Sequence, residues 1–184
     1  LAHSKSTDTI LAYVLENSSD PEQLAQYIAR QDSKGRCMAH YLFNQPRLIQ
    51  RLGHLVPWRL KDKNGQTPVF ALCRSYDHDE YHSMVDQGLL AATFAQEDGL
   101  PLHLDEHVDA KGNSLLHVIT DPLLANKLLY RCDSDANATN DKQFTPLMVA
   151  SKYGRTEMVR VLFQDPRVDL AARDARGLTA VELA

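Results

Sequence analysis

Apolar residues recur at helical spacing in short stretches of this chain, and polar turn residues separate the stretches. In the clearest pair, Thr145-Pro146 opens one stretch, and the next carries Met158 and Leu162 four residues apart. A threonine hydroxyl can cap free N–H groups, and proline suits the first helical position because a donor there would be left unpaired. The pattern therefore predicts a pair of short helices after a turn.

A turn led by Asp or Asn precedes stretches of this kind five times. The residues three positions after the leading side chain are Gly35, Gly65, Gly112, Gln143 and Gly177, at intervals of 30, 47, 31 and 34 residues. The carboxylate or amide oxygen can accept backbone N–H groups, and glycine readily adopts positive φ. Each unit is too small to bury its own apolar face, so we expect neighbouring units to stack.

The segment 140–150, followed by Gly154, resembles the ankyrin repeat, and four further segments align with it on the same turn: 32–40, 62–70, 109–117 and 174–182. The resemblance implies an all-α, ankyrin-repeat solenoid of stacked helix-turn-helix units with short hairpin turns. We expect residues 1–31 to form an N-terminal helical cap and residues 32–184 to form the repeats. The expected repeat boundaries are 32–61, 62–108 with an insertion, 109–139, 140–173 and a truncated 174–184.

Several segments depart from the regular pattern. Residues 7–16 and 21–30 read as two amphipathic helices of the cap, and Asp20 is a plausible N-cap for the second. Cys37-Met38 and Ser114-Leu115 replace Thr-Pro, so helix entry should be less well fixed there. The 47-residue interval between Gly65 and Gly112 is longer than the others and predicts an extended helix over residues 78–97, followed by a loop. This insertion is either a tolerated surface feature or part of a binding face.

Composition and charge limit the kinds of partner and the compartment that we expect for this protein. The formal net charge is −4, which gives no reason to expect nucleic acid or an anionic membrane as the partner. Three widely separated cysteines favour a reducing, cytoplasmic compartment over a disulfide framework, and no apolar run is long enough to cross a bilayer. The chain begins at Leu1 without an initiator methionine, so we expect it to be a piece of a longer protein.

Candidate chemistry is sparse, and we expect no enzyme, no cofactor and no metal site. His78 and His82, and likewise His103 and His107, are spaced four residues apart, which on a helix could hold a divalent metal, yet neither pair has an obvious third ligand. His40 and His117 occupy the histidine position of the repeat, where the resemblance implies a structural hydrogen bond between turns. Trp58 is expected to pack between repeats.

The resemblance also implies a docking face made of the turn tips and the exposed side of each first helix. Carried over by position, the expected partner-binding residues are Arg36, Lys63, Gln66, Arg74, Lys111, Asn113, Lys142, Phe144, Lys152, Tyr153 and Arg176. Most of them are Lys or Arg, which predicts a protein partner with an acidic surface and salt-sensitive association. Solvated lysines at turn tips are the alternative interpretation. Phe144 and Tyr153 are the expected apolar anchors.

We expect a protein-interaction module, that is, a scaffold within a larger protein. The alternatives are an intramolecular structural or autoinhibitory arm and, less favoured, a metal-binding domain. The final repeats, which end in Leu178-Thr-Ala-Val-Glu-Leu-Ala184, resemble the ankyrin segments of endosomal exchange factors for Rab GTPases. That resemblance implies a role in vesicle traffic, a small GTPase or trafficking factor as partner, and recruitment to endosomes through the parent protein without direct membrane insertion.

Overall fold

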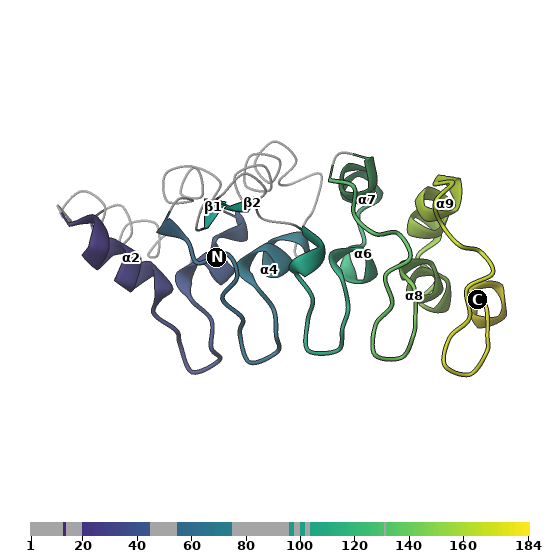
Figure 1. Ribbon diagram of the computed structural model, residues 1–184, viewed down its shortest axis with the longest axis horizontal. Helices are drawn as coiled ribbons and strands as arrows, with labels where there is room; N and C mark the ends of the chain where they lie inside the picture. The colour runs from purple at the N-terminus through teal and green to yellow at the C-terminus, as the bar shows by residue number, and fades with distance from the viewer. Residues whose placement is uncertain are drawn as a thin grey trace.

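The computed structural model describes residues 13, 20–44, 55–74, 96–97, 100–101, 104–130 and 132–184. Figure 1 shows the described helices standing side by side in a row, with hairpin turns projecting in register along one edge. The α-helices are α2 (Pro21–Ala29), α4 (Pro68–Arg74), α6 (Leu115–Val118), α7 (Pro122–Tyr130), α8 (Pro146–Lys152) and α9 (Thr156–Gln164). Three 3₁₀ helices accompany them: η1 (Met38–Asn44), η3 (Leu104–Glu106) and η4 (Val181–Leu183).

The hairpin turns follow directly from their leading side chains. Asp109 Oδ1 accepts the backbone N–H groups of Lys111 and Asn113, each at 2.9 Å, and the other four turns repeat the pattern. The fourth residue has positive φ in every turn, including Gln143 at 58°. Glycine is the residue that adopts this conformation without strain, which explains why it occupies four of the five positions.

Backbone hydrogen bonds connect each turn to the next, and we refer to them as the inter-turn ladder. The four N–H to carbonyl contacts join Lys63 to Lys34 at 3.0 Å, Ala110 to Asn64 at 2.9 Å, Asp141 to Lys111 at 3.1 Å, and Ala175 to Lys142 at 3.5 Å. The same two turn positions are used each time. The ladder crosses the long interval between the second and third turns unchanged, so the turns align along one edge as the repeat predicts.

The core lies between the stacked helices. The first helices form one row, in which α4 packs against η1 and α6, and α8 packs against α6 and η4. In the second row, α7 packs against α9, and α8 packs against α9 between the rows. Leu124, Leu128, Met148 and Leu162 are among the fully buried side chains that fill the space between them. Stacking therefore supplies the interior that no single unit has.

Helix entry varies with the turn sequence, as predicted. The Thr67 and Thr145 hydroxyls accept the N–H groups of Phe70 and Met148, at 3.2 and 3.3 Å, at the starts of α4 and α8. Where Cys37 replaces the threonine, the chain forms the 3₁₀ helix η1, and where Ser114 does, α6 has only four residues. Asp20 caps α2 by accepting the Glu22 N–H at 2.9 Å, as expected.

The irregular unit differs from the sequence prediction. Residues 96–97, expected at the end of a long helix, form strand β1 (Gln96–Glu97), which pairs antiparallel with β2 (Leu100–Pro101). The sequence between the strands is Asp98-Gly99, a dipeptide that favours hairpins over helix. The rest of the expected helix, 78–95, and most of 7–16 lie outside the described residues, so the division into cap and repeats stays a prediction.

Candidate protein-binding groove

A groove of about 830 Å³ runs along the stack between the hairpins and the first helices. It extends across the second, third and fourth turns and is bounded by α4, α6 and α8. Nine of the eleven expected partner-binding residues line it: Lys63, Gln66, Arg74, Lys111, Asn113, Lys142, Phe144, Lys152 and Tyr153. The groove therefore brings together residues that are up to 90 positions apart in the sequence.

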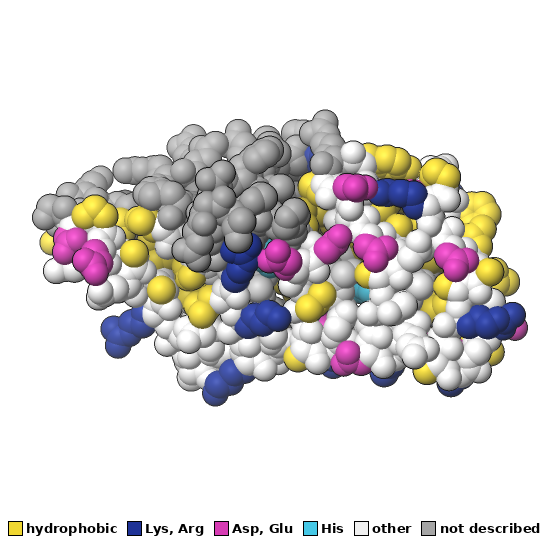
Figure 2. All heavy atoms as spheres, viewed as in Figure 1, with side chains coloured by type: hydrophobic (Ala, Val, Ile, Leu, Met, Phe, Trp, Pro, Cys, Tyr) yellow, Lys and Arg dark blue, Asp and Glu magenta, His cyan; other side chains and the backbone are white. Residues whose placement is uncertain are grey.

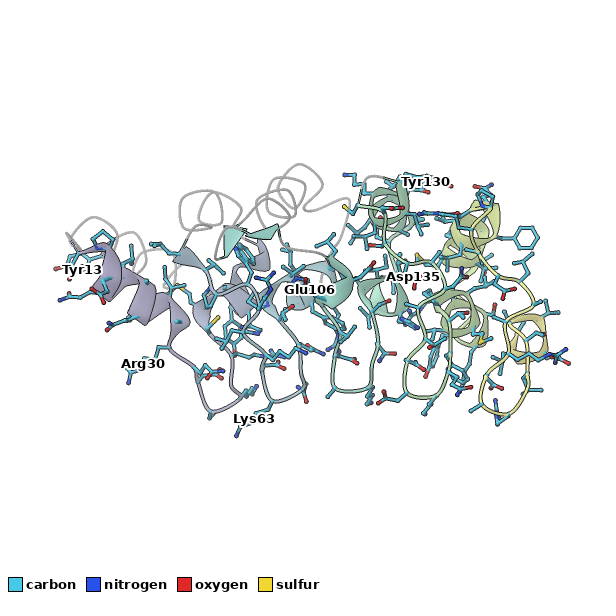
Figure 3. The ribbon with its side chains drawn as sticks, in the orientation of Figure 1. Tyr13, Arg30, Lys63, Glu106, Tyr130 and Asp135 are labelled. Carbon is cyan, nitrogen blue, oxygen red and sulfur yellow. The ribbon has the colours of Figure 1, made fainter. Side chains whose placement is uncertain are left out.

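Positive side chains dominate the groove walls. Lys63, Lys111 and Lys142 lie at successive turn tips, and we call these three the tip rim; Figure 3 shows Lys63 extending from its hairpin. The opposite wall carries Arg74 at the end of α4 and Lys152 at the end of α8, together with Arg155. In Figure 2, dark-blue side chains are spaced along the edge that the hairpins form.

Few carboxylates oppose these cations. Among the carboxylates of the described residues, only those of Asp109 and Asp141 line the groove, and both oxygens of Asp109 are already bonded to groups of its own turn. Within the described residues, no ion pair involves Lys63, Lys111, Lys142, Arg74 or Lys152. The groove is thus a region of positive potential on a chain whose formal net charge is −4.

Arg36 and Arg176, the other two expected residues, do not line the groove. Arg36 Nε donates to Asp62 Oδ2 at 2.9 Å, and Arg176 lies 3.3 Å from Asp174 Oδ2. Burial pushes the pKa of Asp62 upward, but hydrogen bonds from the Gln66 backbone and from Arg36 hold that pKa below its usual value. Both arginines therefore neutralise a turn aspartate, and less of their charge is available to a partner.

The aromatic pair contains one exposed ring and one buried ring. Tyr153 is 65% exposed, whereas Phe144 is only 7% exposed and cannot project toward a partner as an anchor would. The Lys152 ammonium lies 5.0 Å from the Phe144 ring centroid and 5.9 Å from that of Tyr153. Arg155 lies 5.5 Å from the Tyr153 centroid, so cation–π contacts hold the two cations against the rings.

Two buried histidines connect neighbouring repeats, in the structural role that the sequence indicates. His40 Nε2 lies 2.8 Å from the Gln66 carbonyl oxygen, and His117 Nε2 lies 2.7 Å from that of Phe144. Each Nδ1 accepts a backbone N–H, so Nε2 carries the proton that it donates to the carbonyl. Burial lowers the pKa of both imidazoles, which keeps them neutral.

The Cys37–His40 pair resembles a nucleophile and its base, since Sγ and Nδ1 are 3.3 Å apart. Both side chains are buried, and burial raises the pKa of the Cys37 thiol. A reactive cysteine needs a lowered pKa and an accessible sulfur. The environment of Cys37 opposes both requirements, so the pair is part of the core.

The metal-site alternative receives no support from the described part of the chain. It contains no cluster of three or more His, Cys, Asp or Glu side chains able to hold an ion. His78, His82 and His103 lie outside the described residues. His107 is 1% exposed, and its Nδ1 lies 2.5 Å from the Thr67 hydroxyl oxygen. This contact, which no sequence pattern predicts, joins the irregular loop to the start of α4. Trp58, at 3% exposed, is packed inside as expected.

Stability should fall between pH 7 and pH 5 because His107 is buried in its neutral form. Burial lowers the pKa of His107 from 6.5 to about 4, so the unfolded chain takes up a proton in this range and the folded chain does not. The stability that this neutral imidazole contributes is fully present above pH 6.5 and is lost as the pH falls toward 4. The expected loss at pH 5 is about 2 kcal/mol of unfolding free energy.

Urea denaturation of the unaltered chain and of His107→Asn at both pH values tests this expectation. The variant should lose about 2 kcal/mol less than the unaltered chain on acidification, since His40 and His117 titrate in both proteins. An identical pH dependence in the two proteins contradicts it.

Comparison with known proteins agrees with the repeat geometry. A family model described as ankyrin repeats (many copies) matches residues 128–184. The helical stack and this match define the fold as an ankyrin-repeat solenoid, as predicted. Ankyrin repeats are a non-enzymatic class that generally mediates protein–protein interaction.

Along most of its length the chain is similar to fungal proteins designated UPF0507. A UPF0507 protein of Yarrowia lipolytica is 37% identical over 179 residues, which cover 96% of this chain and 17% of the relative. The relative from Scheffersomyces stipitis is 35% identical over 92% of this chain and 14% of its own length, and one from Saccharomyces cerevisiae is 34% identical over 88% and 22%. The chain thus spans less than a quarter of these proteins, whose names state no activity, partner or compartment.

Within the described part of the chain, no helix combines the length and apolar character needed to span a bilayer.

Proposed function

We propose that this ankyrin-repeat segment docks a protein partner on its groove and that the partner presents an acidic surface there. The observation that carries the proposal is the excess of positive charge in the groove: six cations line it, against two carboxylates. None of the six cations forms an ion pair within the described part of the chain. A groove that needs only structural stability has no reason to concentrate like charges, which repel one another.

The exposed ring of Tyr153 supports the same proposal. Tyrosine provides a large contact area with little loss of conformational entropy, and its hydroxyl can hydrogen-bond a partner. Lys152 and Arg155 both contact the ring, so part of the binding surface is ordered before a partner arrives. The groove thus offers charge for attraction and one aromatic ring for contact.

The proposed partner class extends to a small GTPase or a trafficking factor, with recruitment of the parent protein to endosomes. This part of the proposal rests on the C-terminal resemblance to exchange-factor segments alone. The intramolecular alternative, in which the groove holds an acidic part of the parent chain itself, uses the same charge complementarity. Adding the remainder of the parent protein to this segment in solution distinguishes an outside partner from the intramolecular alternative. Under the intramolecular alternative, the remainder binds the groove and competes with outside partners.

Charge reversal in the groove should weaken partner capture by at least about tenfold. The variant Lys111→Glu/Lys142→Glu/Lys152→Glu and the unaltered chain are used as baits in cell extract, and captured proteins are quantified at about 50 and 300 mM salt. Partners should be lost from the variant and, for the unaltered bait, released at the higher salt because screening weakens exposed charge pairs. A matched control, Arg30→Glu/Lys61→Glu/Arg160→Glu, makes the same charge change at exposed positions outside the groove.

The control bait should retain the partners, and all baits should show the same melting temperature and helical content. Equal capture by the groove variant and the unaltered chain contradicts the proposed docking face.

A further inference from the structure

Arg155 is the one arginine in the described part of the chain that is partly buried and pairs with no carboxylate. Two others, Arg30 and Arg74, also lack an acidic partner, but both are exposed, so water solvates their charge. A partly buried charge without a counter-ion is costly, because burial removes some of its water and nothing replaces it. The remaining six described arginines lie 2.6–3.9 Å from an Asp or Glu oxygen: Arg36, Arg59, Arg160, Arg167, Arg173 and Arg176.

Two contacts hold the Arg155 guanidinium in place at the groove. Its Nη1 donates to the His117 carbonyl oxygen at 3.0 Å, and its Cζ lies 5.5 Å from the centroid of the Tyr153 ring. His117 is itself fixed by its contact with the Phe144 carbonyl oxygen at 2.7 Å. The Lys152 ammonium lies 5.9 Å from the same Tyr153 centroid, so two cations contact one exposed ring. Arg155 therefore loses little conformational entropy when a partner binds.

The contact with His117 leaves one edge of the guanidinium open. An arginine has five N–H donors, and a carboxylate accepts two parallel hydrogen bonds from one edge of the planar group. The bond to His117 uses Nη1, and within the described residues the Arg155 side chain makes no other hydrogen bond. Nε and Nη2 share the opposite edge of the group, so both are free to donate to a single carboxylate.

The described carboxylates near Arg155 do not supply that acceptor. Both oxygens of Asp109 bond to groups of its own turn, and Asp141 Oδ1 lies at the tip, 2.8 Å from the position that a Cβ on Gly112 would take. Glu157, the acidic residue closest to Arg155 in the sequence, pairs with Arg160 at 3.1 Å and does not line the groove. The acceptor for Arg155 is therefore left to a binding partner.

We infer that Arg155 determines which partner the groove accepts, by binding one Asp or Glu carboxylate of that protein through Nε and Nη2 while Lys152 adds a second positive charge. The inference rests on the proposed function and names the specificity-determining contact within the same groove. Arg155 is not among the residues expected from the sequence, because it lies in neither a turn tip nor a first helix; it precedes α9. Lysine carries the same charge but lacks the planar pair of donors, so it cannot replace Arg155.

Charge-conserving variants test the inference with a fluorophore-labelled hexaglutamate peptide whose ends are blocked. Binding to the full 184-residue chain is measured by fluorescence anisotropy at about 50 mM salt. We expect Arg155→Lys to weaken binding about tenfold, since it removes a paired, charge-assisted contact and leaves the net charge unchanged. The matched control Arg30→Lys changes another unpaired arginine that is exposed and outside the groove, and its affinity should equal that of the unaltered chain. A hexaglutamine peptide should not bind measurably.

A spectroscopic measurement separates recognition from a structural role. In the unaltered, ¹⁵N-labelled chain, the Nε–H resonance of Arg155 should move downfield when the hexaglutamate peptide is added, because a hydrogen bond to a carboxylate deshields the proton. The Nε–H resonance of Arg30 should stay in place. A residue that only links His117 to α9 would show no such shift, even if its replacement lowered the affinity. Thermal melts check that both variants remain folded.

Equal affinity of Arg155→Lys and the unaltered chain for hexaglutamate, with binding lost in Lys111→Glu/Lys142→Glu/Lys152→Glu, overturns the inference and leaves the acidic docking face intact. An Arg155 Nε–H resonance that does not move when the peptide binds also overturns the inference. The same holds if the unaltered chain does not bind hexaglutamate at all. If, in addition, the charge-reversed groove captures the same proteins as the unaltered chain, the proposed function fails as well.

Discussion

The variant Gly65→Ala should lose about 3 kcal/mol of unfolding free energy, of which about 1 kcal/mol reflects the left-handed backbone and about 2 kcal/mol the displaced neighbour. Gly65 has φ of +73°, which an L-residue with a Cβ adopts with strain. A Cβ at this position would lie 2.6 Å from the Ala110 nitrogen and 3.1 Å from its Cα. Both are backbone atoms, so no side-chain rotation relieves the contact. The Ala110 N–H is also the donor of the ladder bond to Asn64.

Gly177→Ala is the matched control, since Gly177 has φ of +80° and no atom lies within 4 Å of the position a Cβ would take. Its expected cost is about 1 kcal/mol, from backbone strain alone. Urea denaturation, followed by far-ultraviolet circular dichroism, measures both variants. Equal losses would show that close stacking of the second and third turns adds nothing to the cost.

A second large effect is expected for His117→Leu, which should destabilise the chain by about 3 kcal/mol. Leucine fills much of the buried volume but cannot hydrogen-bond. The Phe144 carbonyl loses the Nε2–H donor at 2.7 Å, and the Ser114 N–H loses its Nδ1 acceptor at 3.0 Å. Buried polar groups left without partners are costly because the folded chain keeps water from replacing them.

Ser114→Ala provides the comparison for His117→Leu. It removes only the hydroxyl that lies 2.8 Å from His117 Nδ1 and leaves both backbone contacts of the imidazole in place. The expected cost is below about 1 kcal/mol. Thermal melts of the two variants measure the difference, and a loss for His117→Leu no larger than that for Ser114→Ala would contradict the linking role of the histidine.

The regular repeats were predictable because their information is local. An oxygen-bearing side chain, a glycine three residues later and Thr-Pro at the helix start each act within one turn, so the sequence around residues 62–70 specifies its own conformation. The irregular unit was not predictable in the same way. The pairing of Gln96–Glu97 with Leu100–Pro101 and the contact between His107 and Thr67 depend on residues that fold back from a distance.

The candidate site was predicted by position, and all the exceptions but one have a common origin; the other, Arg176, is an exposed third residue that pairs with Asp174 of its own turn. The third residue of each turn, such as Lys111 or Lys142, is exposed or lies at the tip, but the residue after the positive-φ position turns inward. Gln66 and Phe144 occupy this inward position and are buried, and Arg36 occupies it too and bonds to Asp62 of the next turn. The position of a residue within the turn does not reveal which way its side chain points. The sequence therefore predicts all these positions as tip residues, because the direction of the chain as it leaves the turn is a three-dimensional property.

The inter-turn ladder uses peptide groups alone, through positions occupied by Lys63, Ala110, Asp141 and Ala175 as donors. These four positions carry three different kinds of side chain, a lysine, an aspartate and two alanines, and all four form the same bond. Amino-acid replacements at the tips can therefore alter which partner is bound without changing the spacing between neighbouring turns. Selection for a new ligand and selection for a folded chain act on separate parts of the same hairpin.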